Sequence, residues 1–125
     1  MEFTAFDAFA GYLVLDAWIA NRDRHDENWS ILLPGPPHDD TEQRRLCGSY
    51  DHAGGLGYNV SDVVCSRLLA EDEGVAKWVS KGTAYRFEFD PTTGPLTLVE
   101  LANRALHMAG EQTRRFWLDR LERVS

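Results

Sequence analysis

The sequence predicts a mainly α-helical fold with one small β-hairpin, on three observations. Apolar residues recur at steps of three and four near both ends of the chain, which is the spacing of amphipathic helices. In the first half, two short runs that favour strands flank a segment rich in proline, and this pattern is typical of a hairpin. The length of 125 residues suits one domain, and we expect residues 1–125 to form it.

The composition excludes several classes of protein. Apolar residues make up 43% of the chain and charged residues 26%, which is typical of globular rather than disordered proteins. The net charge of -7 argues against a nucleic-acid partner. We see no secretory signal and no apolar run near the roughly 18 residues of a membrane span, so no membrane association is expected. Cys47 and Cys65 stand outside any Cys-x-x-Cys pattern, which fits the reducing cytoplasm, the expected location.

The first half of the chain is expected to supply one helix and both strands. An amphipathic helix is predicted from Phe3 to Ala20, with Thr4 as its N-cap. A polar run over residues 21–28 ends it, because this stretch is too charged for a core and has no helical pattern. Strands are predicted at Trp29–Leu33 and Arg45–Tyr50, with their turn near residues 34–44, where prolines stop the first strand.

The middle of the chain is expected to turn and then become helical. Three glycines closely follow Asp51 and permit a left-handed backbone and close approach of other groups. Either Ser61 or Asp62 is expected to cap a helix. A short helix around Val75–Val79 and an extended segment at Tyr85–Phe89 are predicted to follow.

Two further helices are predicted at the end of the chain. Thr97-Leu98-Val99-Glu100 has the pattern of a capping box and opens a helix that runs to Ala109. Gly110 separates it from a last helix that carries the apolar residues from Phe116 to Val124. The four tryptophans stand beside other apolar residues, so we expect all of them in the core: Trp18, Trp29, Trp78 and Trp117.

Two polar loops flank the predicted hairpin and carry residue types that are typical of catalytic and metal-binding sites. The first loop reads Asn21-x-Asp23-x-His25-x-x-Asn28, and the second centres on Asp51. Phosphoryl transfer to a hydroxyl group requires one carboxylate near the hydroxyl, and an Asn and a second carboxylate to hold magnesium against the nucleotide phosphates. Because a hairpin brings both loops to the same end, we expect Asp23, Asn28 and Asp51 to converge there.

These loops resemble the catalytic and metal-binding loops of HipA-like kinases, over Asn21–Asn28 (N-R-D-R-H-D-E-N) and Tyr50–His52 (Y-D-H). The Asp-Arg-His-x-x-Asn core is also similar to that of phosphoinositide kinases, whose fold is related. The resemblance implies the C-terminal lobe of a protein kinase-like (α+β) fold. It further implies that Asp23 is the catalytic aspartate and that Asn28 and Asp51 bind Mg²⁺ and, through it, ATP.

The resemblance assigns roles to neighbouring residues as well. It implies that His25 is a structural residue of the loop and that Asn21 braces it. His52 and Ala53 stand where a DFG motif has Phe-Gly, a departure that both families tolerate. The match is strong over roughly residues 12–58, and the later helices fit such a lobe only in general character.

The two features with which a kinase covers and binds the nucleotide phosphates do not appear in the sequence. A kinase covers the ATP phosphates with a glycine-rich loop and pairs them with a lysine. Gly11 is the only glycine ahead of Asp23, and no lysine precedes Lys77. We therefore expect a C-terminal lobe whose N-terminal kinase lobe belongs to a separate or longer chain, and little activity from this chain alone. A protein serine or threonine is the expected acceptor; lipid and small-molecule acceptors stay open.

A metal-dependent hydrolase is an alternative from a different enzyme class. Its ligands to zinc, iron or manganese would be His25, the run His38-Asp39-Asp40, and the pair Asp51-His52. No two histidines stand four residues apart on a predicted helix to form a rigid site.

A non-catalytic interaction module derived from a kinase lobe is the other alternative. In that case the face of the first helix around Phe3, Phe6 and Phe9 would expose aromatic area for a partner. The role of the two loop arginines also stays open, since Arg22 and Arg24 could contact phosphates or pair with local acidic residues.

Overall fold

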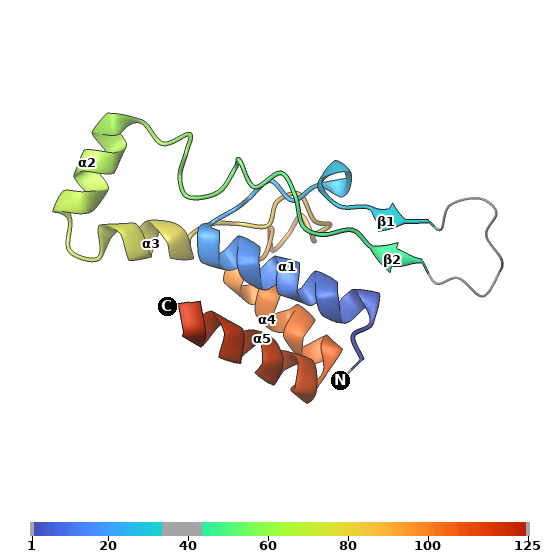
Figure 1. The fold of residues 1–125 in the computed structure, drawn as a ribbon. Helices are drawn as coiled ribbons and strands as arrows, with labels where there is room; N and C mark the ends of the chain where they lie inside the picture. Colours follow the sequence, from blue (N-terminus) through green and yellow to red (C-terminus); the bar gives the residue numbers. More distant parts are fainter. Residues whose placement is uncertain (1, 34–43, 125) are drawn as a thin grey trace.

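The computed structural model describes residues 2–33 and 44–124 of the chain (Figure 1). The described residues are mainly helical with one small antiparallel sheet, so the predicted mainly-α architecture with a hairpin is confirmed. In chain order the elements are α1 (Ala5–Ile19), the 3₁₀-helix η1 (Asp26–Asn28), β1 (Ile31–Leu32), β2 (Arg45–Leu46), α2 (Asp62–Ala70), α3 (Gly74–Ser80), α4 (Leu98–Ala109) and α5 (Glu111–Val124).

Helix α1 begins with a capping box. The Thr4 side chain accepts a hydrogen bond from the Asp7 N–H at 3.1 Å, and the Asp7 carboxylate accepts one from the Thr4 N–H at 2.8 Å. The same carboxylate accepts a bond from the Thr113 hydroxyl at 2.7 Å, and the Asp7 carbonyl accepts one from the Trp117 indole at 2.9 Å. The bonds from Thr4, followed by that from Thr113, lower the pKa of Asp7. The start of α1 is therefore tied to α5.

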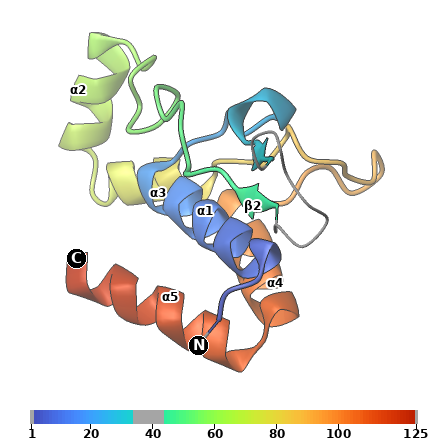
Figure 2. The same cartoon turned by 45° about the vertical axis from the view of Figure 1, so that its right-hand side comes forward.

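The core lies between α1, α4 and α5, which pack side by side (Figure 2). A Cβ atom on Gly11 would overlap the indole ring of Trp117, so glycine allows α5 to approach α1 closely. Small and branched apolar side chains fill the space between α1 and α4: Ala10, Leu13, Val14, Ala102, Ala105 and Leu106.

The hairpin is shorter than predicted. β1 and β2 pair antiparallel with Ile31 opposite Leu46 and Leu32 opposite Arg45, so neither predicted strand reaches its full length. Beyond β2 the Cys47 N–H still donates to the Ser30 carbonyl at 2.8 Å, and the Tyr50 hydroxyl then donates to the Glu27 carbonyl at 2.9 Å. The predicted turn falls, apart from Arg44, outside the described residues.

Helices α2 and α3 form an arm that is less buried than the α1–α4–α5 base (Figure 1). Ser61 is the N-cap of α2, and its hydroxyl accepts a bond from the Val64 N–H at 3.4 Å, which settles the choice between Ser61 and Asp62. No residue of α2 is buried. Val63 and Leu69 are about four-fifths exposed, at 80% and 78%.

The segment between α3 and α4 differs from its prediction. Tyr85–Phe89 begins with a turn rather than an extended strand, and the Phe87 N–H donates to the Ala84 carbonyl at 3.0 Å. The turn lets Phe87 pack against Phe9 in the core, with ring centroids 6.5 Å apart. Thr97 then caps α4 through a capping box with Glu100, as predicted.

The prediction that all four tryptophans lie in the core is wrong for Trp18, which is 50% exposed. Trp18 lines an apolar groove between α1 and α5, together with Trp117, and no described side chain fills that groove. The other three tryptophans are partly buried. Phe3 and Phe6 are also partly exposed, although Phe3 packs on Phe116 with ring centroids 4.6 Å apart.

Candidate active site

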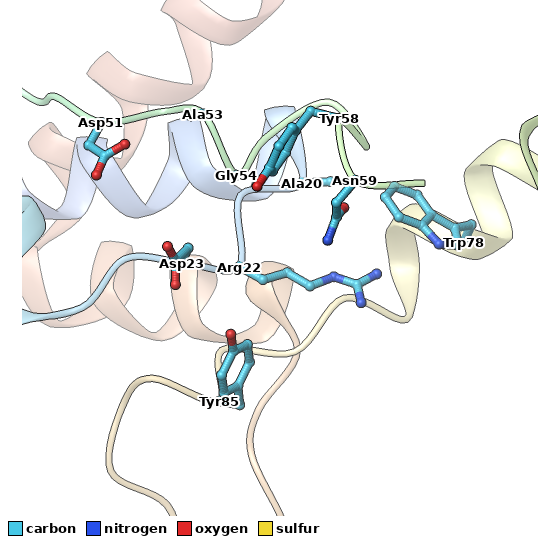
Figure 3. Close-up of a pocket in the computed structure, with 10 residues that line it drawn as sticks. All are labelled: Ala20, Arg22, Asp23, Asp51, Ala53, Gly54, Tyr58, Asn59, Trp78 and Tyr85. Carbon is cyan, nitrogen blue, oxygen red and sulfur yellow. The ribbon is translucent and has the colours of Figure 1, made fainter. Parts of the chain in front are cut away.

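The two polar loops meet at one pocket of about 490 Å³, which Asp23 and Asp51 both line (Figure 3). Asp23 comes from the loop that follows α1, and Asp51 comes from the chain after β2. Trp78 of α3 and Tyr85 of the segment between α3 and α4 also line the pocket. The structure thus brings both carboxylates of the predicted site to the same face of the molecule.

Asn28 lies behind Asp23 rather than in the pocket wall. Its side chain is buried, and the amide nitrogen donates a hydrogen bond to the Asp23 carbonyl at 2.7 Å. Of the three residues predicted to converge, Asp23 and Asp51 share the pocket, whereas Asn28 does not line it. His25 caps η1, because its Nδ1 accepts a bond from the Glu27 N–H at 3.2 Å. That contact is the one expected of a structural residue.

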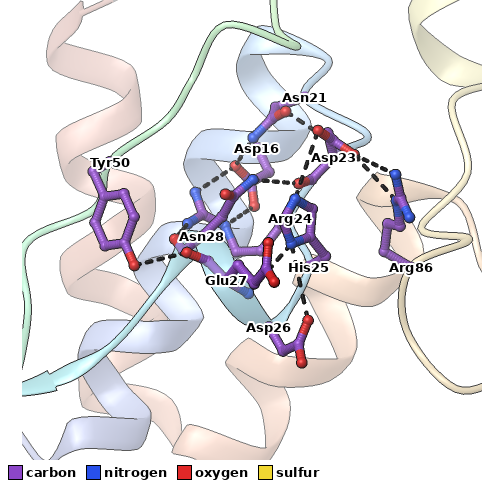
Figure 4. Close-up of polar contacts among 10 residues, drawn as sticks. All are labelled: Asp16, Asn21, Asp23, Arg24, His25, Asp26, Glu27, Asn28, Tyr50 and Arg86. Atoms are coloured by element: carbon purple, nitrogen blue, oxygen red, sulfur yellow. Dashed lines mark hydrogen bonds and ion pairs between the residues drawn. The ribbon is translucent and has the colours of Figure 1, made fainter.

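A buried polar network holds the first loop against α1 (Figure 4). The guanidinium of Arg24 binds both carboxylate oxygens of Asp16, at 2.5 and 2.7 Å, and both side chains are only 2% exposed. Asn21 donates to the same carboxylate at 2.9 Å, and its oxygen accepts a bond from the Asp23 N–H at 3.2 Å. Asn21 therefore braces the loop by linking Asp23 to α1.

Arg24 also joins the first loop to the second. It donates to the Asn28 carbonyl at 3.0 Å and to the Ser49 hydroxyl at 2.9 Å. The Ser49 hydroxyl in turn lies 2.7 Å from Nε2 of His52. Of the two hypotheses for Arg24, pairing with a local acid is therefore correct, although the partner is Asp16 of α1. A guanidinium so enclosed is not available to a phosphate.

Asp51 has a left-handed backbone, with φ of 56°. Aspartate is one of the few residues other than glycine that adopt this conformation readily. Three residues later, a Cβ atom on Gly54 would lie only 3.1 Å from the Asn21 side-chain oxygen and from Cβ of Asp23. The glycine therefore lets the second loop approach the first closely enough to share a pocket with it.

The second loop is also fixed to the end of α1. The Leu56 N–H donates to the Ile19 carbonyl at 2.6 Å, and a Cβ on Gly55 would lie 3.0 Å from the Ile19 side chain. Ala20 ends α1 with a left-handed backbone, and its N–H donates to the Asp16 carbonyl. These contacts fix the point where the first loop leaves α1 and hold the second loop against the end of the same helix.

An exposed ion pair holds the Asp23 carboxylate. Nη2 and Nε of Arg86 lie 2.9 and 3.1 Å from Oδ1 of Asp23, and the side chains are 44% and 42% exposed. The hydrogen bond that Arg86 donates to Asp23 is the main cause that raises the pKa of Arg86. Sequence reasoning missed Arg86, because it stands 63 residues from Asp23 in a segment without a motif.

The described residues lend no support to a transition-metal site. Within residues 2–33 and 44–124, no three His, Cys, Asp or Glu side chains gather in a way that would hold a metal ion. His25 caps η1 and His52 contacts Ser49, so both histidines have other structural contacts. The third candidate group, residues 38–40, lies outside the described residues.

Three comparisons, with protein-family models, with curated proteins and with solved structures, find no match to this chain. In the described part of the chain, no helix combines the length and apolar character needed to cross a membrane.

Proposed function

We propose that the chain is the phosphate-transferring lobe of a HipA-like kinase, which acts with ATP and Mg²⁺ on a hydroxyl group. One observation carries the proposal: Asp23 and Asp51, from loops on either side of the hairpin, line the same pocket. Phosphoryl transfer needs two carboxylates with separate tasks, one toward the acceptor hydroxyl and one toward the metal.

Asp23 and Asp51 have surroundings that suit these tasks. The Asp23 backbone is fixed by Asn21 and Asn28, while its carboxylate is half exposed at the pocket. It would orient the acceptor hydroxyl and take its proton. Asp51 would bind the metal through its carboxylate, since hard oxygen ligands are those that magnesium prefers. Asn28 is the second ligand on the resemblance alone, because its buried side chain does not line the pocket. When bound, magnesium neutralises charge on the nucleotide phosphates.

Both Arg86 contacts are to Oδ1 of Asp23, so an acceptor hydroxyl would meet Oδ2 directly and Oδ1 only in place of Arg86. The pair is exposed and therefore weak, so an incoming substrate can displace it. A protein serine or threonine is the proposed acceptor, and the N-terminal kinase lobe on a separate or longer chain is the proposed partner.

Two substitutions test the assigned roles, in the chain combined with its N-terminal lobe. Asp51→Ala should weaken magnesium–nucleotide binding, measured by calorimetry. Asp23→Asn should leave that binding largely intact but lower phosphate transfer by about 10²- to 10⁴-fold, because a positioned base is lost. Asp26→Asn is the matched control, since the Asp26 side chain is 95% exposed and does not line the pocket. Equal loss of binding from Asp51→Ala and Asp23→Asn would show that the roles are wrongly assigned.

The chain alone should show no appreciable turnover with magnesium–ATP. No lysine precedes Lys77 to neutralise the phosphates, and each missing electrostatic contact in a preorganised site costs on the order of 10²- to 10³-fold in rate. Autophosphorylation and ATP hydrolysis are the measurements. Robust turnover that disappears in Asp23→Asn would show that no further lobe is required.

The interaction-module hypothesis is favoured by a different observation, the apolar groove between α1 and α5 around Trp18. The two hypotheses make opposite predictions for the pocket. A pure interaction module would bind no magnesium–nucleotide in any combination with an N-terminal lobe, and Asp23→Asn would change none of its properties beyond local stability.

A further inference from the structure

We propose that the pocket also binds an anionic group of the phosphate acceptor, with Arg22 as the cation that holds it. This inference rests on the proposed function, since it specifies the chemistry of the molecule on which Asp23 would act. It concerns the half of the pocket formed by Arg22, Tyr58, Trp78 and Tyr85, here called the aromatic end (Figure 3).

Arg22 has no acidic partner among the described residues. Arg24 and Arg86, by contrast, each pair with an aspartate. The Nε of Arg22 is buried and has no hydrogen-bond partner in the described part of the chain. A half-buried guanidinium without a counter-charge is costly, and an anion bound in the pocket would supply that counter-charge.

The Arg22 guanidinium is nevertheless held in place. It stacks over the Trp78 ring, with 4.9 Å between its central carbon and the ring centroid. On another side it lies close to Gly82, where a Cβ atom would be 3.3 Å from Nε. A stacked guanidinium keeps its planar N–H edge free to bind a carboxylate or phosphate with two parallel bonds. The side chain is thus preorganised for an anion.

The charges of the pocket are separated along its length. Asp23 and Asp51 lie at one end, and the Arg22 side chain extends away from them toward Trp78 (Figure 3). An anion beside Asp51 would be repelled, and Arg86 is already paired with Asp23, whereas Arg22 would attract an anion. A ligand that matches this layout places a hydroxyl group near Asp23 and a negative group at the aromatic end.

Exposed aromatic rings line the space between these groups. Tyr58 is 72% exposed and Tyr85 is 48% exposed, although both line the pocket. Exposed aromatic side chains around a pocket are typical of sites that contact planar or apolar parts of a ligand. We therefore specify the acceptor as a serine- or threonine-bearing protein segment with a carboxylate or phosphate and an apolar or planar side chain nearby.

Phenyl phosphate is a suitable probe, because it combines an anion with a ring. It is titrated into the 125-residue chain without magnesium or nucleotide, and binding is followed by NMR shifts of the Trp78 and Arg22 signals. A ligand this small should bind with a dissociation constant on the order of 1 mM. Arg22→Gln should weaken binding by about tenfold or more, while Arg22→Lys, which keeps the charge without the planar fork, should lose less.

Three controls make the test specific. Arg67→Gln removes an exposed arginine of α2 that lies outside the pocket, and phenyl phosphate binding should not change. Benzyl alcohol, the neutral counterpart of the probe, should bind much more weakly than phenyl phosphate. Tyr58→Ala supplies a second variant at a well-exposed position, and it should weaken binding about threefold if Arg22→Gln proves too unstable to measure.

The inference fails if Arg22→Gln, or Tyr58→Ala in its place, binds phenyl phosphate as tightly as the unchanged chain, or if benzyl alcohol binds equally well. The nucleotide phosphates are the other source of an anion for Arg22. Competitive displacement of phenyl phosphate by magnesium–ADP, in the chain combined with its N-terminal lobe, would assign Arg22 to the nucleotide and overturn the acceptor assignment. Simultaneous binding supports it. The proposed kinase function has a separate test, the effect of Asp51→Ala on magnesium–nucleotide binding.

Discussion

Two arginine–aspartate pairs lie at the candidate site, and they differ in burial rather than in chemistry. Arg24 and Asp16 are each 2% exposed and join the first loop to α1. Arg86 and Asp23 are 44% and 42% exposed, and Asp23 lines the pocket (the pair is drawn in Figure 4). Both pairs have two close nitrogen–oxygen contacts. The same two residue types therefore serve as a fixed support in one place and as a displaceable contact in the other.

The contrast shows where the site is rigid and where it can change. Water competes for an exposed ion pair, so such a pair contributes little stability and exchanges partners readily. A buried pair has no alternative partner, and removal of one member leaves an uncompensated charge. The loop that carries Asp23 is thus held firmly from behind, through Asn21 and Arg24, while the Asp23 carboxylate in front stays exchangeable.

The largest effect is expected from Arg24→Met. This substitution leaves the buried Asp16 carboxylate without its partner and also removes the bonds to the Asn28 carbonyl and Ser49. The free energy of unfolding should fall by about 3–5 kcal/mol, measured by urea denaturation. The double variant Asp16→Leu with Arg24→Met should recover part of that loss, because no buried charge remains. A loss under about 1 kcal/mol in the single variant would remove the distinction between the two pairs.

Gly11→Ala tests whether the packing of α5 against α1 is as sensitive to substitution as the buried Arg24–Asp16 pair. The added Cβ would overlap the Trp117 indole, and α5 would have to move away from α1. Overpacking of this kind typically costs about 1–3 kcal/mol, again measured by urea denaturation. Gly48→Ala is the control, since a Cβ at Gly48 meets nothing within 4 Å. Equal stability of the two variants would mean that the α1–α5 contact is not tight.

Asp7→Asn should have an intermediate effect that depends on pH. The Asp7 carboxylate accepts bonds from Thr4 and Thr113, so its loss should cost about 1–2 kcal/mol at neutral pH. Its pKa in the folded protein is lowered from 3.8. The ionised group therefore stabilises the fold above that pH, and the contribution disappears as the pH falls through the lowered pKa. Thermal unfolding of both proteins between pH 7 and 2 is the measurement. The difference should stay constant down to about pH 4, near the ordinary pKa of 3.8, and shrink below it; a difference that is unchanged at pH 2 would contradict the assignment.

Arg86→Ala should have the smallest effect on stability, far below that of Arg24→Met, since both members of its pair are exposed. The little that the pair contributes should decrease as salt is added. Urea denaturation at low and high ionic strength measures both quantities. A stability loss comparable with that of Arg24→Met would show that the exposed pair also holds the first loop in place.

Local signals in the sequence predicted the helix starts well. Thr4 and Thr97 each cap a helix in the way that their short-range patterns indicate. The position of Asp23 and Asp51 at one pocket also follows from a local feature, because a hairpin separates the two loops in sequence and returns the chain to the first.

Non-local partners could not be predicted in the same way. Asp16 stands in an apolar helix, and only its spatial contact with Arg24 reveals it as the support of the loop. An acidic residue inside an apolar helix was the available signal. Arg86 meets Asp23 only because the chain turns between Ala84 and Phe87, within the segment Tyr85–Phe89 that was predicted to be extended. Trp18 is exposed although its neighbours are apolar, since apolar neighbours in sequence do not show which face of α1 is covered.

The hydrogen bond from Leu56 to Ile19 has a consequence for amide exchange with solvent. The Leu56 side chain is 81% exposed, yet its N–H donates to the end of α1 at 2.6 Å. An amide in an exposed loop normally exchanges its hydrogen quickly, but this one can exchange only when the second loop separates from α1. Its protection in deuterium exchange therefore measures how often the loop that carries Asp51 separates from the end of α1, and a single amide signal reports that opening.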